Sequence, residues 1–365
     1  MPGSDPLAQV RARMTPSPAD TLLLRAAFGP ADQFDNAFDA WSKAVGSAPD
    51  LTAYNMLQLL APRLSGRDEA EPLVALCRRQ YRLTWAKARL TERRHGAILA
   101  ALADHDIPVV IFKGLGFASY YGDPGLRCPG DLDILVAQDD FRKVTAYFHA
   151  HGTPVFDHHD PAAFDPRYGH AITYKTTSGD LVDVHAHVFH CWWTWLIESD
   201  LLRSATRPIS VSGVKCETLS AEHHLILLAE HRFSSMTAGS RWIADTWMII
   251  SSGEIDWERL ATDAERLGLA SITAAALIIL RSLGADVPEA PIRALGALKQ
   301  PATRLVDADD PDWRKILQRA QALWFLSNGQ LGRFIPAFAA NSHNGIGRRM
   351  RSWMHALVKP RIDVR

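Results

Sequence analysis

Apolar side chains recur every three to four residues along residues 19–105 and again after Ser220, which is the period of an amphipathic helix. Between Pro108 and Thr218, short runs rich in β-branched residues alternate apolar and polar positions, which is typical of strands. The order along the chain is therefore helical, then mixed, then helical. We predict an α+β fold in which a small β-sheet core is flanked by N-terminal and C-terminal helical segments.

The same pattern divides the chain into five parts. The first, residues 1–18, contains Pro, Ser and Arg without periodicity, and we interpret it as a disordered lead-in. The others are an N-terminal helical region, a mixed core, a C-terminal helical region and a basic tail, which cover residues 19–105, 106–218, 219–330 and 331–365.

The stretch 109–136 contains the strongest chemical signal. An apolar run predicts a strand that ends in Lys113-Gly114, and a Gly/Pro-rich loop then leads to a second predicted strand with Asp131 and Asp133. Residues i and i+2 of a strand face the same side, so these carboxylates are expected side by side. Two like charges at such a short distance require a cation between them, which predicts a divalent metal site.

A later segment, Asp180–Val188, alternates cleanly between apolar and polar positions. Asp183, His185 and His187 share its polar face. If this strand lies beside the strand of Asp133, Asp183 becomes the third carboxylate of a cluster. Three carboxylates on neighbouring strands suit two Mg²⁺ ions, which prefer hard oxygen ligands and keep positions for phosphate oxygens.

The histidines of this segment suggest zinc as an alternative metal. His185 and His187 at i and i+2 could bind Zn²⁺, with His190 as a further ligand. The sequence around them offers no other partner at dependable ligand spacing. We therefore favour His185 as a hydrogen-bonding neighbour of the carboxylates.

Gly114 opens a short predicted helix, and the N–H groups at a helix N-terminus can hold phosphate. A side chain at this position would block the approach of phosphate to the backbone, which would account for the glycine. The two features together predict a phosphate site beside the metal site.

Four short motifs follow one another in this region: I-F-K-G, Y-Y-G-D-P-G-L-R, D-L-D-I-L-V and V-D-V-H. At these residues the chain resembles the DNA polymerase β-like nucleotidyltransferase superfamily, and more closely the bacterial nucleotidyltransferase family with a Lys-Gly turn. The resemblance extends from about Leu22 to Leu269 and includes the segments Arg241-Trp-Ile-Ala-Asp and Gly253-Glu-Ile-Asp-Trp. It implies a nucleotidyltransferase core built on a small mixed β-sheet.

The resemblance also implies a role for each candidate residue. Asp131 and Asp133 would bind Mg²⁺, and Asp183 would be a further metal ligand or the base for an acceptor hydroxyl. The superfamily turn is usually Gly-Gly or Gly-Ser, so a lysine replaces the first glycine here. The residues expected to contact the nucleotide are Lys113, Gly114, Arg127 and His185.

The implied reaction transfers a nucleoside monophosphate from an NTP, with ATP as the expected donor, to an acceptor hydroxyl, and it releases pyrophosphate. The acceptor is an unidentified small molecule, peptide or protein. Two alternatives remain open: AMP transfer to a protein or peptide side chain, and a catalytically silent module that binds nucleotide.

A predicted helix in the C-terminal region carries a second group of polar residues. Arg241 and Asp245 are spaced for an i,i+4 ion pair on this helix, with Trp242 as a core residue. The functional alternative is that these residues form a wall of the nucleotide or acceptor pocket.

Composition limits the possible partners and location. Lys+Arg and Asp+Glu are 40 each, so no net field favours nucleic acid or membrane. The four cysteines lack CxxC spacing, which indicates a reducing, cytoplasmic environment. The N-terminus has no apolar signal-peptide core, and the apolar run Leu269–Leu280 is shorter than the roughly 20 residues that span a bilayer.

Overall fold

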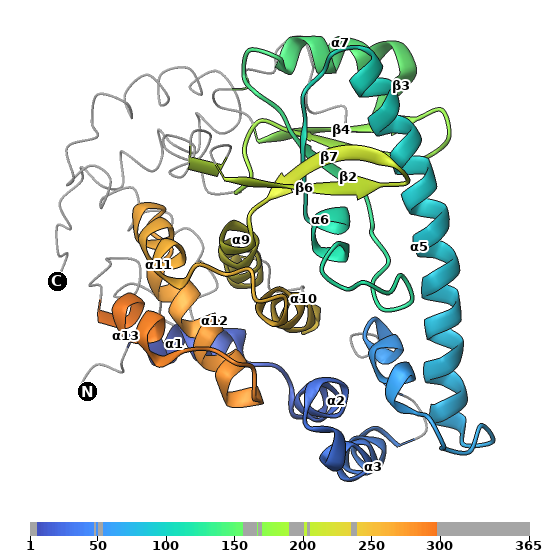
Figure 1. The fold of residues 1–365 in the computed structure, drawn as a ribbon, viewed down its shortest axis with the longest axis vertical. Coiled ribbons are helices and arrows are strands. Elements are labelled where there is room, and N and C mark those ends of the chain that lie inside the picture. Colours follow the sequence, from blue (N-terminus) through green and yellow to red (C-terminus); the bar gives the residue numbers. More distant parts are fainter. Residues whose placement is uncertain are drawn as a thin grey trace, which may run out of the picture.

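The computed structural model describes residues 6–46, 49, 54–155, 166, 170–189, 201–202, 205–234 and 239–297. Its elements confirm the predicted α+β fold (Figure 1). The N-terminal helices are α1 (Pro6–Met14), α2 (Pro18–Phe28), η1 (Ala31–Gln33), α3 (Phe34–Val45), η2 (Leu57–Arg63) and α5 (Pro72–Asp104). The core contains β1 (Val110–Phe112), α6 (Gly114–Ala118), β2 (Leu132–Leu135), α7 (Phe141–His151), β3 (Gly152–Pro154), β4 (Ala171–Thr176), β5 (Leu181–His185), β6 (Thr206–Val211) and β7 (Val214–Leu219). The C-terminal helices are α9 (Ala221–Ser234), α10 (Arg241–Ser251), α11 (Trp257–Arg266), α12 (Ala270–Leu283) and α13 (Glu289–Ala297).

Within the described residues, one seven-stranded sheet has the strand order β3-β4-β5-β2-β1-β7-β6. β2 pairs in parallel with β5, and β1 pairs in parallel with β7. The other neighbouring strands are antiparallel. The sheet is therefore mixed, and it places β2 and β5 side by side near its centre.

The two faces of the sheet have different neighbours. In Figure 1, α7 lies above the sheet, whereas α6, α9 and α10 lie below it. Leu132 and Ile134 of β2 belong to the same apolar cluster as Val144 and Phe148 of α7. Because alternate residues of a strand face opposite sides, Asp133 faces the side of α9 and α10.

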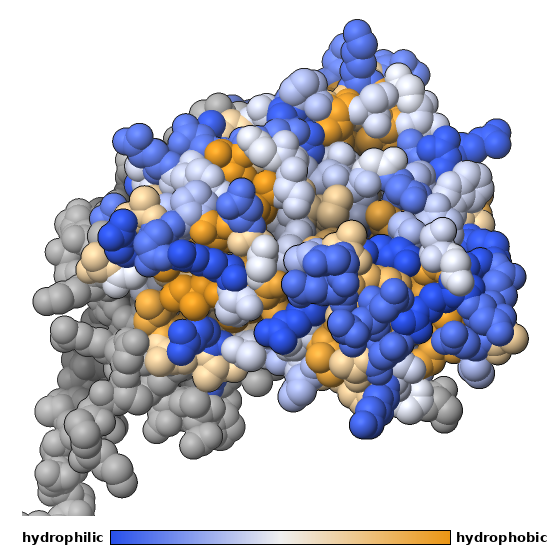
Figure 2. All heavy atoms as spheres, turned by 60° about the horizontal axis from the view of Figure 1, so that its bottom comes forward, coloured by the Kyte–Doolittle hydropathy of each residue, from blue (hydrophilic) through white to orange (hydrophobic). Residues whose placement is uncertain are grey.

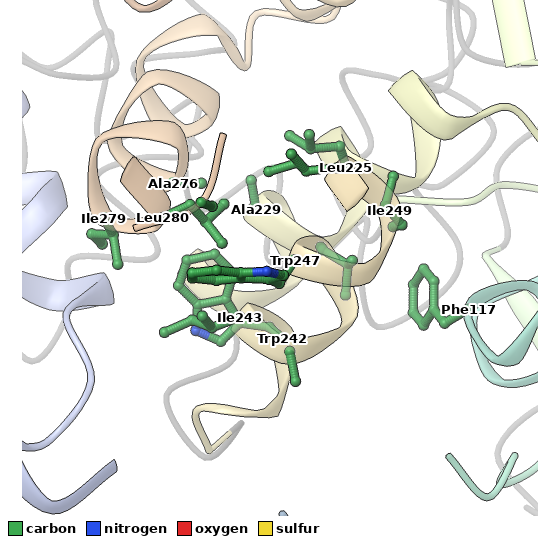
Figure 3. Packing of buried hydrophobic residues seen from close by; sticks show 14 of the residues in the cluster. Phe117, Leu225, Ala229, Trp242, Ile243, Trp247, Ile249, Ala276, Ile279 and Leu280 are labelled. Carbon is green, nitrogen blue, oxygen red and sulfur yellow. The ribbon is translucent and has the colours of Figure 1, made fainter. Parts of the chain in front are cut away.

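The helices below the sheet bury a second, larger apolar cluster. Trp242 and Trp247 of α10 lie between α9 and α12, and Phe117 extends from α6 toward α10 (Figure 3). Full burial of one large apolar side chain stabilises a fold by about 2 kcal/mol, so this cluster fixes α10 against the core. The other labelled members are Leu225, Ala229, Ile243, Ile249, Ala276, Ile279 and Leu280.

Two expectations about the N-terminal region are wrong. Residues 6–14 of the predicted disordered lead-in form α1, whose Val10 and Met14 are buried in the larger cluster. This short helix has too few apolar residues for a clear period, and its stability comes from packing against the distant α12. Within the region 19–105, where the period predicts amphipathic helices, residues Leu57–Arg63 form the 3₁₀ helix η2, which has Pro62 inside it.

The predicted basic tail at 331–365 and the last part of the predicted C-terminal helical region, residues 298–330, lie outside the described residues. The boundaries of the five parts therefore stay predictions.

No described helix is both long and apolar enough to cross a membrane. On the face shown in Figure 2, hydrophilic side chains separate small groups of apolar ones. The large apolar side chains with the greatest exposure are Tyr54, Leu83, Trp85, Leu90 and Val155.

A buried chain of hydrogen bonds joins α9 to α6 and the sheet. Arg207 Nε donates to the Tyr120 hydroxyl at 3.0 Å, so that hydroxyl gives its own proton to His224 Nδ1 at 3.2 Å. His224 Nε2 then donates to Thr218 Oγ1 at 3.4 Å, and Thr218 donates to the Ile111 carbonyl at 2.6 Å. This direction of donation requires a neutral His224 that carries its proton on Nε2.

Complete burial, with the nearby Arg207 and His223, lowers the pKa of His224 well below its ordinary value of 6.5. The unfolded chain therefore takes up a proton near pH 6.5 that the folded chain does not. The stability contributed by neutral His224 is present above that pH and is lost as the pH falls below it.

We expect the free energy of unfolding to fall between pH 7.5 and pH 5.5, by up to about 1.4 kcal/mol per pH unit for each such histidine. Urea unfolding at both pH values measures this loss. His224→Gln keeps an acceptor and a donor but does not titrate, so its loss should be smaller. An equal pH dependence in both proteins would contradict the role of His224.

Candidate active site

The parallel pairing of β2 with β5 brings the two central carboxylates together. Asp133 and Asp183 are register partners, as are Leu135 and His185 two residues further on. Asp133 is buried, whereas the Asp183 side chain remains 25% exposed. The predicted adjacency of the two strands is therefore confirmed, and the site opens on the side of Asp183.

Asp131 lies just before this pair rather than on the strand. β2 begins at Leu132, and Asp131 is an exposed residue at its start. Partial burial raises the pKa of Asp131, and the negative charges of Asp183 and Asp133 raise it further. The three carboxylates thus form one electrostatic group, although Asp131 and Asp133 do not share a regular strand.

Asp133 is the most constrained of the three. Its Oδ1 accepts a hydrogen bond from Lys113 Nζ at 2.7 Å and lies 3.1 Å from His185 Nε2. Burial raises the pKa of Asp133, while Lys113, His231 and His95 act in the opposite direction. A buried carboxylate is stable only with such compensation, and the ammonium group of Lys113 provides it at the shortest distance.

The hydrogen bonds of the His185 ring determine which of its nitrogens carries a proton. Its Nδ1 lies 3.2 Å from the His187 carbonyl, which can only accept, so Nδ1 carries a proton. A neutral ring then has a lone pair on Nε2, directed at Asp133 Oδ1. Two lone pairs at 3.1 Å repel each other unless a proton or a cation lies between them.

Asp183 is more accessible and has a different environment. Burial raises its pKa and the charge of Asp133 adds to the increase, while a hydrogen bond from Thr173 on β4 opposes it. A carboxylate with a raised pKa is a stronger proton acceptor than an ordinary aspartate. Asp183 is therefore suited to a metal ligand or a base.

The residues present fit a divalent cation. Asp133, Asp183 and His185 each offer one ligand atom, and these atoms all lie within 4.8 Å of one another. Two carboxylates provide the hard oxygen ligands that Mg²⁺ prefers, and Asp131 lies close enough to add negative charge.

Lys113 reaches the carboxylates from an unfavourable backbone conformation. Its φ of 51° and ψ of −124° lie in a region that favours glycine and disfavours other residues. Glycine would adopt this conformation without strain, and here a lysine occupies the position. A lysine in a strained backbone conformation that glycine would relieve indicates a role for the lysine ammonium group.

Gly114 is required by a close approach of two backbone segments. A Cβ at this position would lie 3.2 Å from the Asp131 carbonyl oxygen and 3.4 Å from the Gly130 nitrogen. The glycine therefore lets the turn pack against the chain that leads into β2. This close approach positions Lys113 beside Asp133, and the predicted phosphate contact of Gly114 stays a prediction.

Arg127 does not lie with the carboxylates. Its Nε donates to Asp245 Oδ1 on α10 at 2.9 Å, and its Nη1 donates to the Cys128 carbonyl. The expected i,i+4 ion pair of Asp245 with Arg241 is wrong, because the carboxylate pairs with Arg127 from the loop instead. The sequence could not show this pairing, since the two residues are 118 positions apart.

The zinc alternative receives no support from the described residues. His187 Nε2 lies 3.0 Å from the Pro166 carbonyl, whereas His185 Nε2 faces Asp133. The third proposed ligand, His190, lies outside the described residues.

Sequence reasoning missed two histidines that act on Asp133, His95 and His231. His231 lies in the last turn of α9, where burial and Lys113 lower its pKa and Asp133 raises it. The sequence carries no signal for this electrostatic interaction, because α9 comes near the carboxylates only through the packing of the helices below the sheet.

The mixed sheet, the carboxylate cluster and the Lys-Gly turn are the features expected of a nucleotidyltransferase. A family model described as "uncharacterised nucleotidyltransferase" matches residues 53–284, well over half of the chain. The chain belongs to this family and is therefore a nucleotidyltransferase.

Two other comparisons add little to this assignment. No curated protein sequence matches the chain. A solved antigenic nucleotidyltransferase-like protein from Paracoccidioides brasiliensis is similar, with 17% identity and a TM-score of 0.33. The match covers 52% of this chain and 93% of that protein, and it is too low to carry an argument.

The strain at Lys113 can be measured directly. Lys113→Gly and Lys113→Ala both remove the ion pair with Asp133, but only glycine relieves the backbone. We expect Lys113→Gly to be more stable than Lys113→Ala by about 1 kcal/mol or more in urea unfolding. Equal stability of the two variants would show that the turn is unstrained.

Proposed function

We propose that the protein is a Mg²⁺-dependent enzyme that transfers a nucleoside monophosphate from ATP to an acceptor hydroxyl and releases pyrophosphate. The observation that carries this proposal is the register pair Asp133–Asp183, with Lys113 at 2.7 Å from Asp133. A cytoplasmic location agrees with the three described cysteines, which are all free: Cys77, Cys128 and Cys216.

In this proposal Asp133 and Asp183 hold Mg²⁺, with Asp131 as the further ligand of a two-ion site. When bound, the metal supplies positive charge that offsets the triphosphate and the departing pyrophosphate. The ligand atoms of Asp133, Asp183 and His185 lie within 4.8 Å of one another, and the pKa of Asp131 is raised in part by its two neighbouring carboxylates, which supports this assignment.

Asp183 is assigned to the acceptor side of the site. The bond that forms joins the acceptor oxygen to the α-phosphorus, and the bond that breaks joins that phosphorus to the β-phosphate oxygen. The hydroxyl proton passes to a carboxylate, and Asp183 is assigned to accept it because its side chain is partly exposed on the open side of the site.

Lys113 is assigned to the phosphates of the nucleotide. Its side chain is 21% exposed, so the ammonium can turn from Asp133 toward a bound triphosphate without movement of the backbone. The strained conformation at this residue supports the role, because glycine would form the same turn at lower cost. His185 lies beside Asp133, and Arg127 lies outside the carboxylate cluster, where it pairs with Asp245.

The test is label transfer from α-labelled ATP with Mg²⁺, supplied with small-molecule and protein fractions of a cell extract as acceptors. We expect transfer by the wild type and a loss of at least about a hundredfold in Asp183→Asn, since one group acts as ligand and base. Intact-mass measurement separates a modified protein from a modified small molecule.

The matched control is Glu217→Gln, an exposed carboxylate on β7 of the same sheet. It should transfer label as the wild type does. Equal transfer by Asp183→Asn and the wild type would contradict the proposal, and ATP binding without any transfer would favour the silent-module alternative.

A further inference from the structure

A second polar cluster lies where α10 meets the loop between α6 and β2. Asp245 Oδ1 accepts hydrogen bonds from Arg127 Nε at 2.9 Å and from the Tyr121 hydroxyl at 2.8 Å. Asp245 is 3% exposed, and the Arg127 side chain is 12% exposed. One carboxylate thus neutralises one guanidinium inside the protein.

Arg241 brings a second guanidinium to the same place. It lies one turn before Asp245 on α10, and its Nη2 is buried without a hydrogen-bond partner. Among the residues that the structure describes, Arg241 forms no ion pair with any carboxylate. Burial and the charge of Arg127 lower its pKa from 12.5, but a guanidinium remains charged at neutral pH.

The charges of this cluster therefore do not balance. The cluster contains two guanidinium groups and one carboxylate. The carboxylate pairs with Arg127, and Arg241 has a buried donor without a partner. A buried cation without a partner is destabilising, and a methionine would fill the same space without that penalty. An arginine in this position is explained if an anion from outside the chain completes the cluster.

We propose that Arg241, with Arg127 beside it, forms an oxyanion-binding site for a phosphate or carboxylate group of a substrate. The planar guanidinium fork matches both groups in a bidentate geometry. This proposal deepens the function proposed above, because it adds a second contact point for the nucleotide or for an anionic acceptor.

The start of α10 supports an anion at this place. Arg241 is the first residue of this eleven-residue helix, whose N-terminus has no side-chain cap. The preceding Ser240 hydroxyl instead donates to Asp20 at 2.6 Å. The uncapped N–H groups and the helix dipole add positive potential to that of the two arginines.

The site is also within reach of a substrate in the carboxylate cluster. Arg127 precedes Asp131 by four residues, so their Cα atoms lie at most about 14 Å apart. Asp131 in turn adjoins Asp133 and Asp183 electrostatically. One bound nucleotide or acceptor can therefore contact both sites.

The test measures thermal stability of the full chain in rising concentrations of inorganic phosphate, without Mg²⁺ or nucleotide, with chloride at equal ionic strength as reference. We expect a saturable rise of Tm in the wild type. In Arg241→Met the phosphate affinity should be at least about tenfold weaker. Without phosphate, this variant should be at least as stable as the wild type.

Two further variants refine the result. Arg266→Met removes an exposed arginine of α11 and should keep the full phosphate effect. Arg241→Lys keeps the charge but loses the planar fork, so its phosphate affinity should lie between those of the wild type and Arg241→Met. If Arg241→Met does not fold, Arg241→Lys replaces it as the test variant.

The outcome separates this site from the catalytic proposal, because no step requires transfer activity. The oxyanion site would be contradicted if phosphate stabilised the wild type and Arg241→Met equally. It would also be contradicted if Arg241→Met were less stable than the wild type by the same amount with and without phosphate. ATP affinity then identifies the ligand: a loss in Arg241→Met indicates a nucleotide phosphate, and an unchanged value indicates an acid group of the acceptor.

Discussion

The buried charge of Asp133 is the constraint on which the site depends. A carboxylate in this position must be compensated, and the chain does so with Lys113 at 2.7 Å, while His185 Nε2 lies 3.1 Å from the same oxygen. These three residues come from the turn before α6, from β2 and from β5. The sheet order that places β5 beside β2, and the glycine that lets the turn approach Asp131, both serve this contact. The same compensation can be supplied by a metal ion, which makes the cluster a candidate for phosphoryl chemistry.

Much of this arrangement could be predicted from the sequence because it depends on local patterns. Strict alternation in Asp180–Val188 placed Asp183 and His185 on one face, and β5 follows that pattern. The hairpin of β6 and β7 turns at Ser212-Gly213, where both residues have positive φ. The strand with Asp133 was equally clear, since its alternate apolar residues pack against α7.

The rest depends on contacts between distant segments, which no local pattern contains. Arg127 was expected near the carboxylate cluster, but the packing of α10 against the core pairs it with Asp245 instead. His231 reaches the site only because α9 lies below the sheet. α1 lacked a visible period, yet a distant helix buries its Val10 and Met14. In each case the partner, and not the residue itself, determines the role.

The central claim is that the carboxylate cluster binds a divalent cation in competition with Lys113, and calorimetric titration of the metal-free protein with Mg²⁺ tests it most directly. The account predicts saturable binding by the wild type, its loss in Asp183→Asn, and tighter binding in Lys113→Met, because the ammonium no longer competes for Asp133. Binding that is unchanged in Asp183→Asn, or weakened in Lys113→Met, would contradict it.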